Sequence, residues 1–399
     1  MRQTLAIGAT ALVFATAKSA QTLHVPGEYA TIQEALDAAP SGAVILVRGG
    51  VWDTITIRRP VSLIGDPPPL IGGLVPFPAP ITLEGDGTGE VTLRGIHAGA
   101  LFPDSITPAH PPPAITGTGF EELHVIDSDV QAPQRFPFSF SGLGYGNSAI
   151  DVDVPAVWVE RTRVTGGGAG IDDACTGNAW IPPAAIEVPE TLVLLDSDVH
   201  GGDVGTFQFA GWPTPDDCDP SNCPVFPGGA GVSCTTLFRA NSPVAGGRGA
   251  RWFTCQIPNV FCCETPPGVP VQATTQHFFV DDIAGDERME LGESYTLTLT
   301  APGPLVRLYV AEGTAGPLLT AFGWMFLDPA TLQRLGSFPS PGQVTLAVPA
   351  DLALFGRRFA FQALDANSVL RRPLVAVALE ARAKIAPRGD PSASAVQSR

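Results

Sequence analysis

The residues with the clearest capacity for chemistry are two pairs of aspartates followed by a histidine. In chain order they are Asp151, Asp153, Asp172, Asp173 and His200. Two carboxyl groups on either side of a glycosidic bond can act as general acid and general base, and a histidine can assist proton transfer. Carboxylates can also hold calcium beside a base that removes a proton next to a carboxylate group. The pattern therefore indicates a polysaccharide hydrolase or lyase as one candidate function.

An oxygen-rich segment between two cysteines is a second candidate site. The run "DDCDPSNC", residues 216–223, contains Asp216, Asp217, Asp219 and Asn222. Carboxylate and amide oxygens are the ligands that calcium prefers. The same run also suits a loop that is closed by a disulfide and holds no metal. Calcium is thus the cofactor that the sequence suggests, and the metal-free loop is the alternative.

A third candidate is an aromatic segment that could contact a ligand. Residues 134–146 include Phe136, Phe138, Phe140 and Tyr145. Aromatic rings pack well on the faces of sugar rings, but they pack equally well on the flank of their own domain. The sequence leaves both interpretations open.

These candidates lie within a set of internal repeats. Three segments share one pattern: "LHVIDSDVQA" (123–132), "VWVERTRVTG" (157–166) and "LVLLDSDVHG" (192–201), with a weaker copy, "LFRANSPVAG", at 237–246. An Ala-Ile pair precedes each of the three. The repeats align if the following residues are equivalent: Ile96, Val130, Val164, Val199 and Val244. Short strands and turns in each unit predict stacked β-repeats, with loops that protrude on one side.

The aspartates of the "DSDV" motif have a structural interpretation as well. Short polar residues suit turns because their side chains bond to nearby backbone groups, although outward calcium or ligand contact remains the alternative. If the repeats stack in register, Asp127 and Asp196 flank Arg161, and Asp129 and Asp198 flank Arg163. Such alternation of charges favours a structural role.

The start of the repeat region reads as a capped end. Thr31 and Glu34 fit a capping box, and the apolar face of the helix that follows contains Ile32, Ala35, Leu36 and Ala39. Short β-runs are expected at 43–47, 54–57 and 61–64. A helix laid across the first repeat would cover its apolar side chains and its unpaired strand groups.

Several features predict export. Residues 1–20 have the basic start, short apolar core and small residues of a signal peptide. The chain contains 7 cysteines, all between Cys175 and Cys263, and an oxidising compartment makes disulfides the default, with one thiol left over. The net charge is −16 and resides mainly in residues 21–275, which argues against nucleic acid or anionic membranes as partners. No later segment is apolar enough to span a membrane.

The sequence predicts four regions. They are a signal peptide (1–20), a β-repeat domain (21–275, irregular and cysteine-rich at 206–275), a β-sandwich domain (276–383) and a disordered tail (384–399). Alternating apolar and polar residues between turn signals support the sandwich.

The opening "YATIQEALDAAPSGAVILVRGGVW", with "TITI" and "VSLIG" after it, resembles the N-terminal cap and first coils of the pectin-lyase-like superfamily. The resemblance implies an all-β fold: a right-handed parallel β-helix with an N-terminal capping helix, followed here by the small β-sandwich. Within that superfamily "GIDDACTG" is similar to the polygalacturonase "GDDC" segment, and "VHGG" to its "GHG". The family's "NTD" and "RIK" motifs are absent, as are the catalytic motifs of pectinesterases.

We therefore expect an exported protein that binds extracellular or cell-surface polysaccharide without catalysis. One alternative is a polysaccharide lyase or glycoside hydrolase that acts on an acidic glycan through aspartates on the β-helix face. A second alternative is a calcium-stabilised structural surface protein. The sequence leaves the oligomeric state open.

Overall fold

The structure is a computed structural model of the chain. It describes residues 21–72, 78–99, 112–132, 147–168, 182–204, 206–209, 227–249, 251–254, 261–264, 266–279, 282–286, 288–351, 354–367, 369–370 and 373–379. The predicted signal peptide at 1–20 and the predicted tail at 384–399 lie outside these ranges. In the described ranges the protein is of the all-β class, with long parallel sheets in its first part.

The chain divides into two compact units after residue 281. The boundary predicted after residue 275 falls inside strand β24 (Val271–Phe278), which pairs in parallel with β20 (Val232–Ala240) of the first unit. The first unit therefore extends a few residues further than the sequence pattern indicated. Strand β24 could not be separated from the second unit by pattern alone, because both regions alternate apolar and polar residues.

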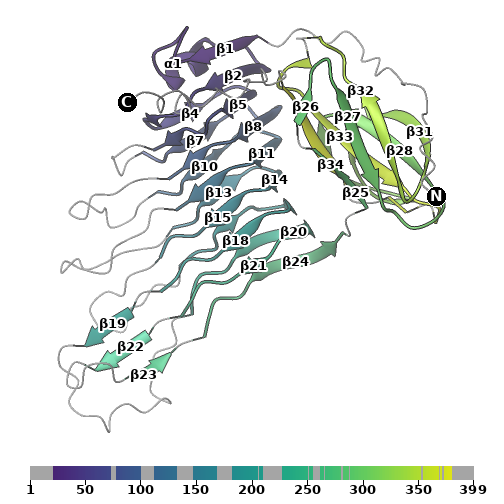
Figure 1. The fold of residues 1–399 in the computed structure, drawn as a ribbon. Coiled ribbons are helices and arrows are strands. Elements are labelled where there is room, and N and C mark those ends of the chain that lie inside the picture. The colour runs from purple at the N-terminus through teal and green to yellow at the C-terminus, as the bar shows by residue number, and fades with distance from the viewer. Residues whose placement is uncertain are drawn as a thin grey trace, which may run out of the picture. The chain divides into compact units, whose positions relative to one another are not determined.

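The first unit is built around a 14-stranded sheet, called here the long sheet (Figure 1). Its strands pair in parallel. Besides β20 and β24 they are β1 (Thr22–Val25), β2 (Ala43–Val47), β4 (Ile55–Ile57), β5 (Val61–Gly65), β7 (Ile81–Glu84), β8 (Glu90–Arg94), β10 (Ile115–Thr118), β11 (Glu122–Ile126), β13 (Ile150–Asp153), β14 (Ala156–Glu160), β16 (Ile186–Glu187) and β17 (Thr191–Leu195). Strand β20 pairs with both β16 and β17, so it joins the two rows of strands into one sheet.

A second parallel sheet has seven strands, and it receives one strand from each repeat. Its order is β21 (Val244–Ala245), β18 (Asp198–His200), β15 (Arg163–Thr165), β12 (Asp129–Gln131), β9 (His97–Ala98), β6 (Leu70–Ile71) and β3 (Val51–Trp52). Three further strands, β19 (Thr206–Phe209), β22 (Arg251–Thr254) and β23 (Phe261–Glu264), form a small sheet within the region predicted to be irregular.

The repeats stack in register, as the sequence predicted for four of the five marker positions. Val130 lies opposite Val164, Val164 opposite Val199, and Val199 opposite Val244. The assignment of Ile96 was wrong, because Ala98 lies opposite Val130. Ile96 instead donates its backbone N–H to the Ser128 hydroxyl, so it occupies the level that hydroxyl residues fill in later repeats. The sequence alignment equated Ile96 with Val130 because both are large and apolar, whereas in the structure the smaller Ala98 pairs with Val130.

The N-terminal cap matches its prediction closely. Helix α1 (Ile32–Ala38) has Thr31 as its N-cap, and both hydrogen bonds of the capping box with Glu34 are present. Ile32, Ala35 and Leu36 are buried in the first unit's core. Strand β2 covers the predicted residues 43–47, and β4 and β5 fall within one residue of their predicted limits. The helix thus supplies apolar cover at the first repeat.

A column of buried hydroxyl groups runs along the inside of the turns between the two sheets. It consists of Ser128, Thr162, Ser197 and Ser242. Each hydroxyl donates to the carbonyl two residues earlier. Each also accepts a backbone N–H from the preceding repeat, at 3.1–3.2 Å. The column therefore gives acceptors to buried backbone N–H groups at these turns, while the four carbonyls also accept a backbone N–H from the neighbouring repeat.

The turn residues just before that column adopt a left-handed backbone conformation. Asp127, Arg161, Asp196 and Asn241 have φ between 45° and 51°. Asp and Asn tolerate this region because their short side chains bond locally. The Asp127 carboxylate bridges Arg94 at 2.8 Å and Arg161 at 2.7 Å. Asp129, Arg163 and Asp198 lie at one level of adjacent strands, so the predicted alternation of charges is present there.

The second unit contains sandwich-like, mainly antiparallel sheets. One sheet has the order β25 (Ile283–Gly285), β27 (Ser294–Leu299), β32 (Gly342–Ala347); the other has the order β26 (Arg288–Glu290), β34 (Leu374–Leu379), β33 (Arg358–Leu364), β28 (Leu305–Glu312), β31 (Gln333–Pro339). Strands β29 (Thr314–Thr320) and β30 (Gly323–Leu327) form a hairpin. Leu297 and Leu346 of the first sheet share one core with Leu308 and Phe361 of the second. In the described ranges no helical segment could cross a bilayer.

Cys234 in β20 is a free thiol in a half-buried position. Its burial raises the pKa of the thiol to about 12. A thiol with such a pKa forms almost no thiolate at neutral pH, which disfavours Cys234 as a nucleophile or metal ligand. The side chains of the other six cysteines lie outside the described residues, and the predicted disulfides stay predictions.

Candidate functional site

A continuous row of polar side chains crosses the long sheet on the face that points away from the core. We call it the polar row. Register pairing places its members at one level of successive strands: Thr56, Thr82, Thr116, Asp151, Glu187 and Ser233. Adjacent parallel strands are about 4.8 Å apart, so the row is roughly 24 Å long. Hydroxyl and carboxylate groups are thus presented at regular intervals along the stack.

The alternation of β-strands puts these groups on the outer face. In β13, Ile150 and Val152 are buried in the core, while Asp151 and Asp153 are exposed. In β10, Ile115 is buried and Thr116 and Thr118 lie on the same face as the aspartates. Thr118 donates its hydroxyl to the Asp153 carbonyl at 3.0 Å. The two predicted residues Asp151 and Asp153 therefore share one accessible face.

Asp151 and Glu187 form a carboxyl pair on neighbouring strands. Loss of hydration raises the pKa of Asp151. Burial also raises the pKa of Glu187, and the negative charge of Asp151 adds to that increase. The backbone N–H of Ala184, which donates to Glu187 Oε1 at 3.1 Å, opposes it in part. Each carboxylate therefore holds its proton to higher pH than usual, which suits groups that exchange protons with a substrate.

The raised pKa values predict that this pair lowers stability at neutral pH. A carboxyl group whose pKa is higher in the folded state binds more protons there than in the unfolded state. The free energy of unfolding therefore falls as pH rises from the unfolded pKa through the folded pKa. Glu187→Gln should therefore raise the melting temperature at pH 7, by the equivalent of at most about 0.5 kcal/mol for so accessible a group. At pH 3, where the raised pKa values keep Asp151 and Glu187 protonated, the difference should disappear. Thermal melts at both pH values measure this, and a variant less stable at pH 7 would contradict it.

The other predicted site residues are not brought to this row by the described part of the structure. His200 is the last residue of β18 in the seven-stranded sheet, where it is exposed and 3.1 Å from Asp198. Asp172 and Asp173 lie outside the described residues. The same holds for the predicted calcium ligands Asp216, Asp217, Asp219 and Asn222, and for the aromatic residues Phe136, Phe138, Phe140 and Tyr145.

Sequence reasoning missed Glu187, although a signal for it was present. An Ala-Ile pair opens each repeat, and the residue after the isoleucine is Thr116, Asp151 or Glu187 in turn. Once the isoleucines are placed in the core, the next residue must point outward at the same level of each strand. The polar row therefore follows from the repeat alignment, but the sequence analysis used only the apolar members of the pattern.

Comparison of the chain with models of protein families, with curated proteins and with solved structures gave no match.

Proposed function

We propose that this is an exported protein whose first unit, a right-handed parallel β-helix of the pectin-lyase-like type, binds extracellular or cell-surface polysaccharide along the polar row. The polar row is the observation that carries the proposal. The repeat-to-repeat stacking of the sheets and the capped N-terminal end support the β-helix. The signal-peptide pattern at 1–20 supports export.

The chemistry of the row suits a sugar chain. Its side chains are hydrogen-bonding groups at strand spacing, about 4.8 Å, which is close to the length of one sugar unit in an extended polysaccharide. Threonine and serine hydroxyls donate and accept, and carboxylates accept from sugar hydroxyls. Asp151, Asp153 and Glu187 also place negative charge on this face, which repels uronate-rich chains. The row therefore favours neutral polysaccharides over acidic ones when no divalent cation is present.

Affinity electrophoresis of the purified mature protein in gels that contain neutral or acidic polysaccharides tests this proposal. Retardation by a neutral polysaccharide is expected. Thr116→Ala combined with Asp151→Ala should weaken it about tenfold, the equivalent of one or two lost hydrogen bonds. Asp198→Ala removes an exposed carboxylate from the seven-stranded sheet and should leave binding unchanged. Equal retardation of all three proteins, or none of the wild type, would reject the polar row as a glycan site.

The carboxyl pair supports a second candidate function, a retaining glycoside hydrolase. Such enzymes hold two carboxyl groups about 5–5.5 Å apart, near the spacing of neighbouring strands. Glu187, whose pKa is raised both by burial and by Asp151, would be the acid, and Asp151 the nucleophile. Under this hypothesis polysaccharide chains shorten during incubation, and Glu187→Gln abolishes the shortening while binding persists. Unchanged chain length across a broad panel leaves binding without catalysis as the function.

A further inference from the structure

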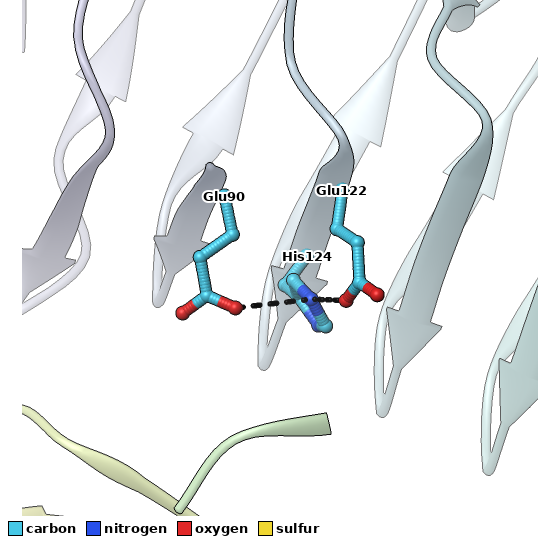
Figure 2. A group of neighbouring side chains, drawn as sticks. All are labelled: Glu90, Glu122 and His124. Atoms are coloured by element: carbon cyan, nitrogen blue, oxygen red, sulfur yellow. Dashed lines mark hydrogen bonds and ion pairs between the residues drawn. The ribbon is translucent and has the colours of Figure 1, made fainter. Parts of the chain in front are cut away.

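A second group of chemically capable side chains lies on other strands of the long sheet, β8 and β11, which follow the strands of Thr82 and Thr116 in the chain. Figure 2 shows Glu90 of β8 together with Glu122 and His124 of β11. One oxygen or nitrogen atom from each residue lies within 4.8 Å of those from the other two. His124 Nε2 is 2.9 Å from a Glu122 oxygen and 3.9 Å from a Glu90 oxygen. We propose that these three residues form a binding site for a divalent transition-metal ion of the zinc class.

Strand register explains how the group is assembled. Glu122 lies opposite Glu90, and His124 lies opposite Thr92. Val91, Leu93, Leu123 and Val125 between them point into the core, so all four polar residues share the outer face. The result is a two-by-two arrangement in which residues distant in sequence are nearest neighbours. Because both strands belong to a continuous parallel sheet, their backbone positions are fixed.

The charges of this group favour a cation. Two glutamates directly opposite each other on adjacent strands destabilise a sheet unless something neutralises them. A neutral imidazole with two carboxylates has a net charge of −2, which one divalent ion balances. Nitrogen and carboxylate ligands together suit zinc and related first-row ions, whereas calcium takes oxygen ligands only.

The distances also fit such an ion. Ligand atoms at about 2.1 Å from a tetrahedral zinc are about 3.4 Å apart, between the two separations measured from His124. Burial holds the imidazole in place, since its side chain is only 2% exposed and its ring stacks on Trp158 with centroids 5.6 Å apart. The Glu90 side chain is 44% exposed, which gives an ion a route from solvent.

Thr92 provides an independent observation. It is 3% exposed, and among the described residues its hydroxyl oxygen has no hydrogen-bond partner. It lies on the same face as the three ligands, beside Glu90 in its own strand and beside His124 in the next. A buried hydroxyl rarely lacks a partner. A metal ion, or a water molecule bound to one, would supply that partner and complete the coordination.

Zinc titration of the full-length protein, after removal of metal with a chelator, tests the proposal. We expect the protein to bind zinc, to melt several degrees higher in its presence, and to give a d–d absorption band with cobalt. Glu90→Gln and Glu122→Gln should each weaken binding about tenfold or more. Without metal, Glu90→Gln should melt at or slightly above the wild-type temperature, because its side chain is half exposed and the change removes one of two facing charges.

His97→Gln is the matched control. His97 lies 3.9 Å from Asp129 in an exposed pair on the seven-stranded sheet, so the variant removes a histidine beside a carboxylate elsewhere on the same unit. Its zinc affinity should equal that of the wild type. The proposal is overturned if the wild type binds no zinc at about 1 mM free metal, or if both glutamate variants bind as tightly as the control. The proposal is independent of glycan binding, because it concerns β8 and β11 and is read by metal affinity alone.

Discussion

Asp127→Asn should lower the free energy of unfolding of the first unit by about 3 kcal/mol, the usual loss when one partner of a buried ion pair is removed. Asp127 is the shared acceptor of two largely buried cations, and the side chains of Arg94 and Arg161 are only 7% and 16% exposed. Asparagine can adopt the same left-handed turn, as Asn241 does at the equivalent position. The loss should therefore come from charge and not from backbone strain. It corresponds to a fall in melting temperature of roughly 6–12 °C.

Asp196→Asn is the control for this variant. Asp196 has the same backbone conformation, but its carboxylate accepts a hydrogen bond from the neutral Asn241 at 2.9 Å. Its replacement should cost clearly less than that of Asp127, because the amide of Asn241 carries no charge for the variant to leave unpaired. Urea unfolding followed by circular dichroism compares the two variants, and equal losses would show that the turn matters and the ion pair does not.

The effect of Asp127 should also depend on pH. Burial alone would raise the pKa of its carboxyl, but the charges of Arg161 and Arg94 outweigh burial and hold the pKa below the ordinary value of 3.8. A carboxyl group with a lowered pKa stabilises the folded state above its unfolded pKa, and that contribution is lost as pH falls through the folded pKa. The difference between wild type and Asp127→Asn should therefore be full at pH 6 and shrink at pH values below 3.8. A difference that stays constant into strong acid would contradict this account.

Thr162→Val should cost about 1–3 kcal/mol, because it removes one member of the buried hydroxyl column. The Thr162 hydroxyl donates to the Glu160 carbonyl at 2.8 Å and accepts the Ser128 N–H at 3.2 Å. Valine keeps the shape of the side chain but can do neither, so both backbone groups lose this partner in a place that water does not reach. The destabilisation thus measures hydrogen bonding between repeats, with packing held nearly constant.

Thr165→Val is the matched control, since it makes the same chemical change three residues later in β15, at a half-buried position. We expect it to be neutral within about 0.5 kcal/mol. Thermal and urea unfolding of both variants decide the matter. If the two threonine variants lose the same stability, the hydroxyl column has no special role.

Much of the fold follows from the sequence because each repeat obeys simple local rules. The capping box at Thr31, the alternation around Ile150 and the aspartates at left-handed turns all express preferences that act over a few residues. Arg161 is the exception, with a φ of 46° that its residue type does not favour. The ion pair with Asp127 forms in that conformation, and such a long-range partner cannot be seen in a local pattern.

The group at Glu90, Glu122 and His124 was missed because Glu90 and Glu122 are 32 residues apart in the sequence (122 − 90) and meet only where two repeats stack. Taking Ile96 as the equivalent of Val130 gives a step of 34 (130 − 96), which would place His124 opposite Glu90. The observed pairing of Ala98 with Val130 gives a step of 32 (130 − 98) and places Glu122 there instead. An error of two residues keeps every side chain on its correct face, so the apolar pattern does not reveal it. Of the polar row only Asp151 was predicted, for the same reason: successive members are separated by 26 (56 to 82) to 46 (187 to 233) residues and meet only through stacking.

The spacing between repeats has a consequence for how this scaffold can diversify. The span from the first strand of a repeat to its last is nearly constant, as in Ile115 to Gln131, Ile150 to Thr165 and Ile186 to His200. The steps between equivalent positions, in contrast, are 32 (98 to 130), 34 (130 to 164), 35 (164 to 199) and 45 (199 to 244). Length therefore varies at one corner of the repeat, after the seven-stranded sheet and just before the strands that carry the polar row. Insertions at that corner change the chain next to the polar row, whereas the stacked strands keep their register. New binding specificities can therefore be introduced there without a change in the strands that form the fold.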